Sequence, residues 1–172
     1  MRLSMTTSFN KWVPFCGANT REKAGQVDLK GKSDKYIWRA SYLTVLNVES
    51  QYVQDPDLDF DNLRFGLSEW KKVSRYMMED FYTLTPWHDS TYRDGFTAYS
   101  FVDAKDDTGY VMAFRMEDCG EEDLTVTLPY AKEGEWLLTD EDTGETIPVT
   151  GGEVTLHFEN PRTARLLWVK KA

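Results

Sequence analysis

At residues 79–86 the chain reads Glu79-Asp80-Phe81-Tyr82-Thr83-Leu84-Thr85-Pro86, and the pattern of apolar residues changes there. Ahead of this stretch, residues 60–78 carry apolar side chains at the three- and four-residue spacing typical of a helix. Behind it, every apolar run is short, alternates with polar residues and is bounded by Gly, Asp or Pro. The sequence therefore predicts two parts that meet at Pro86: an α/β part over residues 1–86 and an all-β part over residues 87–172.

The composition excludes several classes of partner. With 172 residues, the chain is long enough for one domain, or for a small domain plus part of another. Its 41% hydrophobic and 28% charged residues are ordinary for a soluble globular protein. The formal net charge of −9 repels phosphate backbones, which argues against a nucleic-acid partner. No apolar stretch approaches the ~18–20 residues that span a bilayer, so no membrane partner is expected.

The termini and cysteines favour a cytoplasmic location. The N-terminus has one basic residue, Arg2, and lacks the apolar segment of a secretory signal. Cys16 and Cys119 lie far apart in the chain, which favours two free thiols in a reducing compartment over a disulfide. Aromatic residues make up 14% of the chain. This excess is compatible with heavily packed cores and also with a surface that stacks on sugars.

The first half of the chain predicts strands and a long loop. Residues 9–16 are apolar and aromatic and predict a buried strand that ends in a loop at residues 17–20. The polar stretch 21–35 predicts a long loop, and long loops in compact domains are often functional. Residues 36–48 are rich in β-branched and aromatic side chains, which fits a strand buried on both faces of a parallel sheet. A short helix is the alternative there, because periodicity cannot separate the two in so short a run.

Aspartates alternate over residues 55–61, just before the predicted helix. An EF-hand calcium loop starting at Asp55 would need Gly at its sixth position and Glu at its twelfth, where this chain has Phe60 and Gly66. The aspartates therefore predict a helix start, where carboxylates accept from free backbone N–H groups. The expected apolar stripe of the helix consists of Phe60, Leu63, Leu67, Trp70, Ser74 and Met77. Gly66 lies within the helix and predicts close packing.

Seven short strands are predicted beyond Pro86, separated by turns rich in Gly and Asp. They cover residues 96–102, 109–116, 124–128, 135–139, 145–149, 153–158 and 164–170. Short strands at this spacing predict an antiparallel β-sandwich. His157 alternates outward on one of these strands and is expected to be solvated.

Few residues carry recognisable chemistry. His88, His157 and the two cysteines lie too far apart for a zinc site, and the chain has no P-loop, GxGxxG or GxSxG motif. The sequence therefore predicts neither a metal nor a cofactor. Most carboxylates lie in turns or at helix starts, where solvated acids belong, so no catalytic residue is predicted.

Four residues beside the first two predicted strands are candidates for substrate binding: Trp12, Asn19, Trp38 and Arg39. In a parallel barrel the loops that follow the strands form the working face. A Trp there can stack on a sugar, and an Arg can hold a hydroxyl or a carboxylate. The alternative is that Trp12 and Trp38 are core residues and that Arg39 is a structural ion-pair partner.

Three segments, in this order, resemble the C-terminal end of glycoside hydrolase family 36, the α-galactosidase (melibiase) group. They are Lys11-Trp12-Val13-Pro14-Phe15-Cys16-Gly17, Asp34-Lys35-Tyr36-Ile37-Trp38-Arg39-Ala40-Ser41, and the stretch from Glu69-Trp70-Lys71-Lys72 to Pro86. They look like a late barrel strand, the segment leading into the last barrel strand, and the last barrel helix with its exit. The strands after Pro86 look like the family's C-terminal β-sandwich, so the likeness covers nearly the whole chain.

The resemblance implies the last strands and helix of a TIM-type barrel, followed by an all-β antiparallel sandwich. It also implies hydrolysis of terminal α-galactosides by double displacement, without a metal or organic cofactor. The family's nucleophile and acid/base segments are not found in this sequence, and both would lie upstream of Met1. Retaining hydrolysis needs two carboxyl groups ~5–5.5 Å apart, so the isolated chain is expected to be inactive.

The expected partners are an α-galactoside or other small carbohydrate and the missing upstream half of the barrel; homo-oligomers are left open. Two strands and one helix cannot close an eight-stranded barrel, and the helical stripe would have too little to cover. The alternative function is a non-catalytic carbohydrate-binding or structural β-sandwich module.

Overall fold

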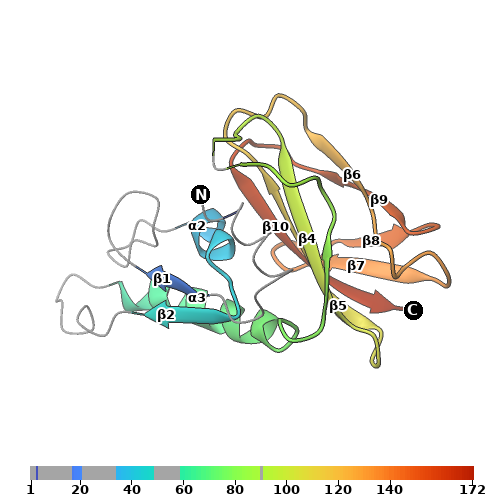
Figure 1. The fold of residues 1–172 in the computed structure, drawn as a ribbon, viewed down its shortest axis with the longest axis horizontal. Coiled ribbons are helices and arrows are strands. Elements are labelled where there is room, and N and C mark those ends of the chain that lie inside the picture. Colours follow the sequence, from blue (N-terminus) through green and yellow to red (C-terminus); the bar gives the residue numbers. More distant parts are fainter. Residues whose placement is uncertain (1–2, 4–16, 21–33, 49–58, 90) are drawn as a thin grey trace.

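A computed structural model describes Leu3 and residues 17–20, 34–48, 59–89 and 91–172. Its centre is a six-stranded antiparallel sheet with strand order β3-β4-β5-β10-β7-β8. Helices α2 and α3 pack on one face of this sheet, and the two-stranded sheet β6-β9 packs on the other (Figure 1). The described part of the second half is therefore an antiparallel β-sandwich, as the sequence predicted.

The strands of the sandwich follow the predicted ranges closely. They are β3 (Asp80–Thr83), β4 (Phe96–Asp103), β5 (Thr108–Arg115), β6 (Asp123–Thr127), β7 (Trp136–Asp140), β8 (Thr146–Val149), β9 (Glu153–His157) and β10 (Thr163–Lys171). All seven strands predicted beyond Pro86 are present, with ends within one residue of the prediction. Strand β3 was not predicted. It lies ahead of Pro86 and pairs with β4. The sheet thus begins before the residue at which the sequence predicted the change of architecture.

Strands β4 and β5 in the central sheet are buried on both faces, because both sets of alternating side chains are largely apolar. In β4, every residue from Phe96 to Val102 is buried. The face toward the helices is largely aromatic and consists of Tyr99, Phe101, Tyr110, Met112, Phe114, Ala164, Leu166 and Trp168. The opposite face packs on β6 and β9 through Ala98, Val111, Ala113, Leu138, Leu167 and Val169. The sheet therefore separates two hydrophobic cores, and the helices complete one of them.

The first half contains a parallel pair of short strands, β1 (Gly17–Thr20) and β2 (Val45–Val48). Residues 17–20 were predicted to be a loop and are a strand. The run 36–48 is wrong as one long strand: helix α2 (Lys35–Ala40) comes first, and β2 follows. The physical reason is the helix cap at Asp34, whose carboxylate accepts from the backbone N–H of Ile37. The predicted strand 9–16 and most of the predicted loop 21–35 lie outside the described residues.

Helix α3 (Phe60–Ser74) begins at the Asp59 cap, which accepts from the backbone N–H of Asn62, as expected for a helix start. The predicted stripe is confirmed at Leu63, which is buried, and at Leu67 and Trp70, which pack against the core. It is wrong at Phe60, which is 46% exposed, and it left out Glu69 and Val73, which are buried. The close packing predicted at Gly66 is confirmed: a Cβ atom there would lie 2.2 Å from the ring of Trp38. The expectation that the helix would have too little to cover is wrong, because α3 packs on the aromatic face of the sheet.

Candidate functional site

The four candidate binding residues fall in different environments. Trp12 lies outside the described residues. Asn19 lies in β1, where the structure describes the backbone but not the side chain. Trp38 and Arg39 lie in α2, and both are 0% exposed. The structure thus places Trp38 in a core and Arg39 in an ion-pair cluster, as the alternative reading has it; contact of either with a sugar stays a prediction.

The parallel pair places two asparagines opposite each other. In the β1-β2 register Asn19 is paired with Asn47, each at the third position of a four-residue strand. Strands of a parallel pair end at the same edge, where ligand-binding loops of α/β folds gather. The segments that follow, 21–33 and 49–58, lie outside the described residues. The sequence alone did not single out Asn47, because the register of a parallel pair cannot be read from either strand alone.

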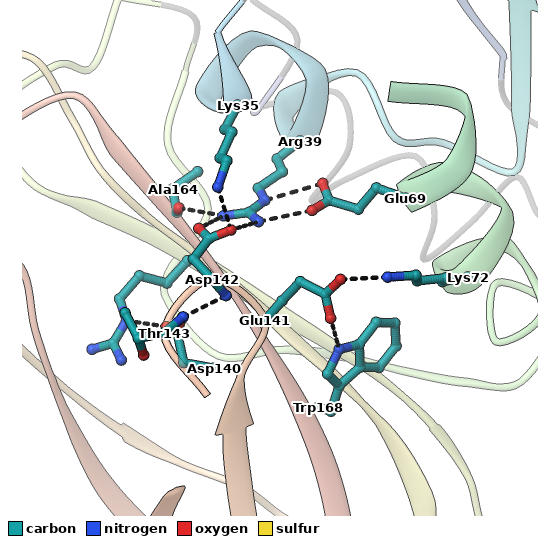
Figure 2. Close-up of polar contacts among 11 residues, drawn as sticks. Lys35, Arg39, Glu69, Lys72, Asp140, Glu141, Asp142, Thr143, Ala164 and Trp168 are labelled. Atoms are coloured by element: carbon teal, nitrogen blue, oxygen red, sulfur yellow. Dashed lines mark hydrogen bonds and ion pairs between the residues drawn. The ribbon is translucent and has the colours of Figure 1, made fainter. Parts of the chain in front are cut away.

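Arg39 is the centre of a charged junction between the helices and the sandwich (Figure 2). Its Nε and Nη2 atoms donate to the two carboxylate oxygens of Glu69 in α3, at 3.1 and 2.8 Å. Its Nη1 and Nη2 atoms also donate to Asp142 in the β7–β8 turn, at 2.8 and 2.9 Å. A further bond reaches the carbonyl of Ala164 in β10, at 2.8 Å. One guanidinium therefore joins both helices, a hairpin turn and the central sheet.

The electrostatics of the junction favour its ionised form. Burial opposes the charge on Arg39, but the hydrogen bonds to Glu69 and Asp142 outweigh burial and raise the pKa of the guanidinium. Burial also opposes the charge on Asp142, yet its bonds from Arg39 and Lys35 hold the pKa of this carboxyl below its usual value. Lys35 reaches Asp142 at 2.6 Å. Each buried charge in the junction thus has a partner, as such charges require.

The β7–β8 turn is itself held in shape. The backbone N–H groups of Asp142 and Thr143 donate to one carboxylate oxygen of Asp140, at 2.9 and 3.0 Å. The other oxygen accepts from Nε of Arg165, at 2.8 Å. Asp140 is buried, so these bonds satisfy its carboxylate and fix the direction in which Asp142 points.

A second contact of the turn lies beside the first. One oxygen of Glu141 accepts from Nζ of Lys72 and the other from Nε1 of Trp168, both at 2.5 Å (Figure 2). Burial opposes the charge on Glu141, but the bonds from Lys72 and Trp168 together keep the pKa of this carboxyl below its usual value. Lys72 belongs to α3 and Trp168 to β10, so Glu141, like Asp142, joins the β7–β8 turn to a helix and to the central sheet.

The junction around Arg39 joins α2 to α3, to the β7–β8 turn and to β10, and its geometry does not suit acid–base catalysis. A general acid or base needs a proton that can pass to a substrate. The carboxylate oxygens of Glu69 and Asp142 instead accept hydrogen bonds from Arg39, and Glu69 is 3% exposed. Among the described residues no group of three or more His, Cys, Asp or Glu side chains could hold a metal ion.

Neither histidine belongs to this junction. His157 is exposed, as predicted, and its Nδ1 lies 2.8 Å from a carboxylate oxygen of Asp123. His88 stacks on Tyr92 with ring centroids 3.6 Å apart, next to Trp87, which is 62% exposed. No helix in the described ranges is both long and apolar enough to cross a bilayer.

The fold of this chain is similar to parts of two solved α-galactosidase structures. No protein-family model matches the sequence, and a search of curated proteins finds no match. Among solved structures, the galactosidase domain of the α-galactosidase–sucrose kinase AgaSK matches 79% of this chain with a TM-score of 0.54 and 13% identity. AgaA, a glycoside hydrolase family 36 α-galactosidase from Geobacillus stearothermophilus solved with raffinose, matches 91% with a TM-score of 0.58 and 14% identity. The matches cover only 19% and 22% of those chains, so this chain spans about a fifth of their length.

Proposed function

We propose that this chain acts as the C-terminal portion of an α-galactosidase-like glycoside hydrolase. In this proposal residues 1–86 are the last strands and helix of a (β/α)8 barrel, and residues 87–172 are the sandwich that follows it. The observation that carries the proposal is the fold match to AgaA, which runs through 91% of this chain and so includes both halves. The parallel pair β1-β2 supports it, since parallel strands followed by a helix are the building unit of such barrels.

The proposed role of the first half is to form part of the sugar pocket. Asn19 and Asn47 lie near the ends of the parallel strands, where amide groups can hydrogen-bond sugar hydroxyls. Trp12 is the proposed stacking surface. Trp38 and Arg39 are proposed to hold α2 against α3 through their contacts with that helix. The reaction would be hydrolysis of terminal α-galactosides, with a pair of carboxyl groups ~5–5.5 Å apart that other barrel segments supply.

The proposed role of the second half is to hold the end of the barrel in place. Helix α2 leads directly into β2, and Arg39 fixes α2 to α3 and to the β7–β8 turn. Catalytic and binding groups must be held to within about half an ångström of their working geometry. A sandwich joined to the barrel through a buried arginine and an aromatic core supplies that rigidity.

The test measures hydrolysis and binding by the chain itself. We expect no turnover of an aryl α-galactoside, and weak saturable binding of galactose. The variants Asn19→Ala and Asn47→Ala should weaken binding, whereas Asn160→Ala, in an exposed loop, is the matched control and should not. Co-expression with an upstream barrel segment that carries the paired Asp residues should restore hydrolysis. Robust turnover by the chain alone would contradict the proposal.

A carbohydrate-binding module is the second candidate, and one observation favours it. Trp87 is 62% exposed beside the stacked pair His88 and Tyr92. The face of an exposed Trp ring can stack on a sugar ring. The same galactose titration separates the two functions. Loss of binding in Trp87→Ala, with binding intact in Asn19→Ala and Asn47→Ala, would identify a module. The opposite pattern would identify a pocket at the end of the barrel.

A further inference from the structure

We propose that a groove between α3 and the β7–β8 turn binds an organic phosphate of about the size of a monosaccharide. One wall consists of Ser68, Lys71, Lys72 and Arg75, and the other of Glu141 and Trp168. The wall residues of α3 are spaced by three and four positions, so they share one face of the helix. The groove measures about 530 Å³. That volume lies within the ~300–1,000 Å³ typical of small-molecule sites.

The groove has a net positive charge, which favours an anionic ligand. Lys72 is neutralised by Glu141 at 2.5 Å (Figure 2). Lys71 and Arg75 have no carboxylate partner in the part of the chain that the structure describes. Two positive charges thus remain in one groove of a chain whose net charge is −9. A phosphate monoester carries nearly two negative charges at neutral pH and matches them.

The walls of the groove are already arranged for binding. The guanidinium of Arg75 lies over the ring of Tyr76, 4.4 Å from its centroid, and donates to the Tyr76 hydroxyl. Trp168 packs against Tyr76 and Tyr110 and donates from Nε1 to Glu141. A half-buried indole on one wall, and on the other Arg75 held against Tyr76 with Lys71 beside it, suit a ligand with a ring and a charged group. This is why we assign the groove to a phosphorylated ring compound and not to free phosphate.

A competing explanation is that these cations serve only the helix. Lys71 and Lys72 lie in the last turn of α3, where the helix dipole favours positive charge by ~0.3–1 kcal/mol each. That explanation accounts for the charges but not for a groove with an indole wall opposite them. It also predicts no saturable binding, which makes the two explanations separable.

The experiment uses the full chain labelled with ¹⁵N, and follows the indole N–H resonance of Trp168, assigned with Trp168→Phe. Glucose 6-phosphate should give a saturable shift of this resonance, inorganic phosphate a weaker one and glucose none. The double variant Lys71→Gln/Arg75→Gln should lower the affinity about tenfold or more, because two charge-assisted hydrogen bonds are lost. Gln keeps high helix propensity, so we expect this variant to fold.

The matched control is Lys132→Gln/Lys170→Gln, which makes the same change in net charge at two exposed sites outside the groove. Binding should survive it. No saturable shift at millimolar glucose 6-phosphate would overturn the proposal, as would equal weakening in both double variants. Equal affinity for inorganic phosphate would overturn recognition of the ring, and equal affinity for glucuronate would overturn the choice of phosphate.

Discussion

The most consequential single residue is Arg39, because its charge is fully buried. Its side chain is 0% exposed and pairs with the side chain of Glu69, which is 4% exposed. Arg39→Met leaves Glu69 buried without its partner. Removing one member of such a pair typically costs ~3–5 kcal/mol, and we expect a loss of that size in the free energy of unfolding measured with urea.

Two further variants show whether the loss comes from the unpaired charge. In Arg39→Met/Glu69→Leu no charge of the Arg39–Glu69 pair remains buried, so stability should recover in part. Arg64→Met breaks an ion pair with Asp61 in which both partners are exposed. Exposed pairs contribute ~0–1 kcal/mol, so this control should barely change the free energy of unfolding. An equal effect of Arg39→Met and Arg64→Met would contradict the structural role of the junction.

Gly66 gives a second prediction at this scale. A methyl group at residue 66 would lie 2.2 Å from the Trp38 ring, whose Nε1 donates a 2.5 Å hydrogen bond to Asn62 of the same helix. Overpacking costs ~1–3 kcal/mol, whereas Ala gains up to ~1 kcal/mol over Gly in a helix. We therefore expect Gly66→Ala to lower the free energy of unfolding by about 1–2 kcal/mol. At Gly120 an added Cβ meets nothing within 4 Å, so Gly120→Ala is the control.

The sequence predicted the packing role of Gly66 but not the junction around Arg39. A glycine inside a helix is less stable than an alanine there, so its presence indicates that a side chain would not fit. The partners of Arg39 are 30 and 103 residues away in the chain, and no local pattern marks either. Asp142 stands in a turn rich in carboxylates, where solvated acids are the ordinary expectation. Only the folded structure shows that the Asp142 carboxylate accepts hydrogen bonds from the buried Arg39.

At the scale of elements, prediction worked where the pattern is local. Alternating apolar residues and Gly-rich turns marked seven strands to within one residue. Strand β3 was missed because it follows the helix without a Gly-rich turn and is a strand through its pairing with β4. Helix α2 was hidden inside a run of β-formers, since a single cap at Asp34 and packing against the sheet decided its conformation.

The β7–β8 turn gives a prediction about pH. The ion pairs of Asp142 lower its pKa in the folded chain below the ordinary 3.8. A lowered pKa stabilises the fold above pH 3.8, and this contribution is lost as the pH falls through the folded-state pKa. Asp142→Asn should therefore be clearly less stable than the parent at pH 7, and the difference should shrink below about pH 4. Urea unfolding at a series of pH values measures it.

The control for this prediction is Asp61→Asn, because Asp61 is 93% exposed. It should change the free energy of unfolding by less than ~0.5 kcal/mol at pH 7. A pH-independent difference between Asp142→Asn and the parent would mean that the carboxylate charge does not hold the turn to the helices.

At the scale of the whole molecule, the two halves share one core. The sheet face toward α2 and α3 contains aromatic side chains that the helices cover almost completely: Tyr99, Phe101, Tyr110 and Phe114 are 0–2% exposed. The sequence indicated that the first half is incomplete, because two strands and one helix cannot close a barrel. The sequence could not indicate that the helices cover this face. A strand buried on both faces has the same apolar pattern whether helices or another sheet cover it.

This shared face leads to a prediction about the sandwich alone. A fragment of residues 79–172 keeps every strand of the central sheet but exposes its aromatic face. Exposed apolar patches of more than a few hundred Å² promote association, so we expect the fragment to self-associate on size-exclusion chromatography and to bind an apolar dye. Replacing Phe101 and Phe114 with Thr, a good strand former, should reduce both effects. A monomeric, cooperatively unfolding fragment without dye binding would instead make the sandwich an independent domain, and the helices would then be a separate layer that merely rests on it.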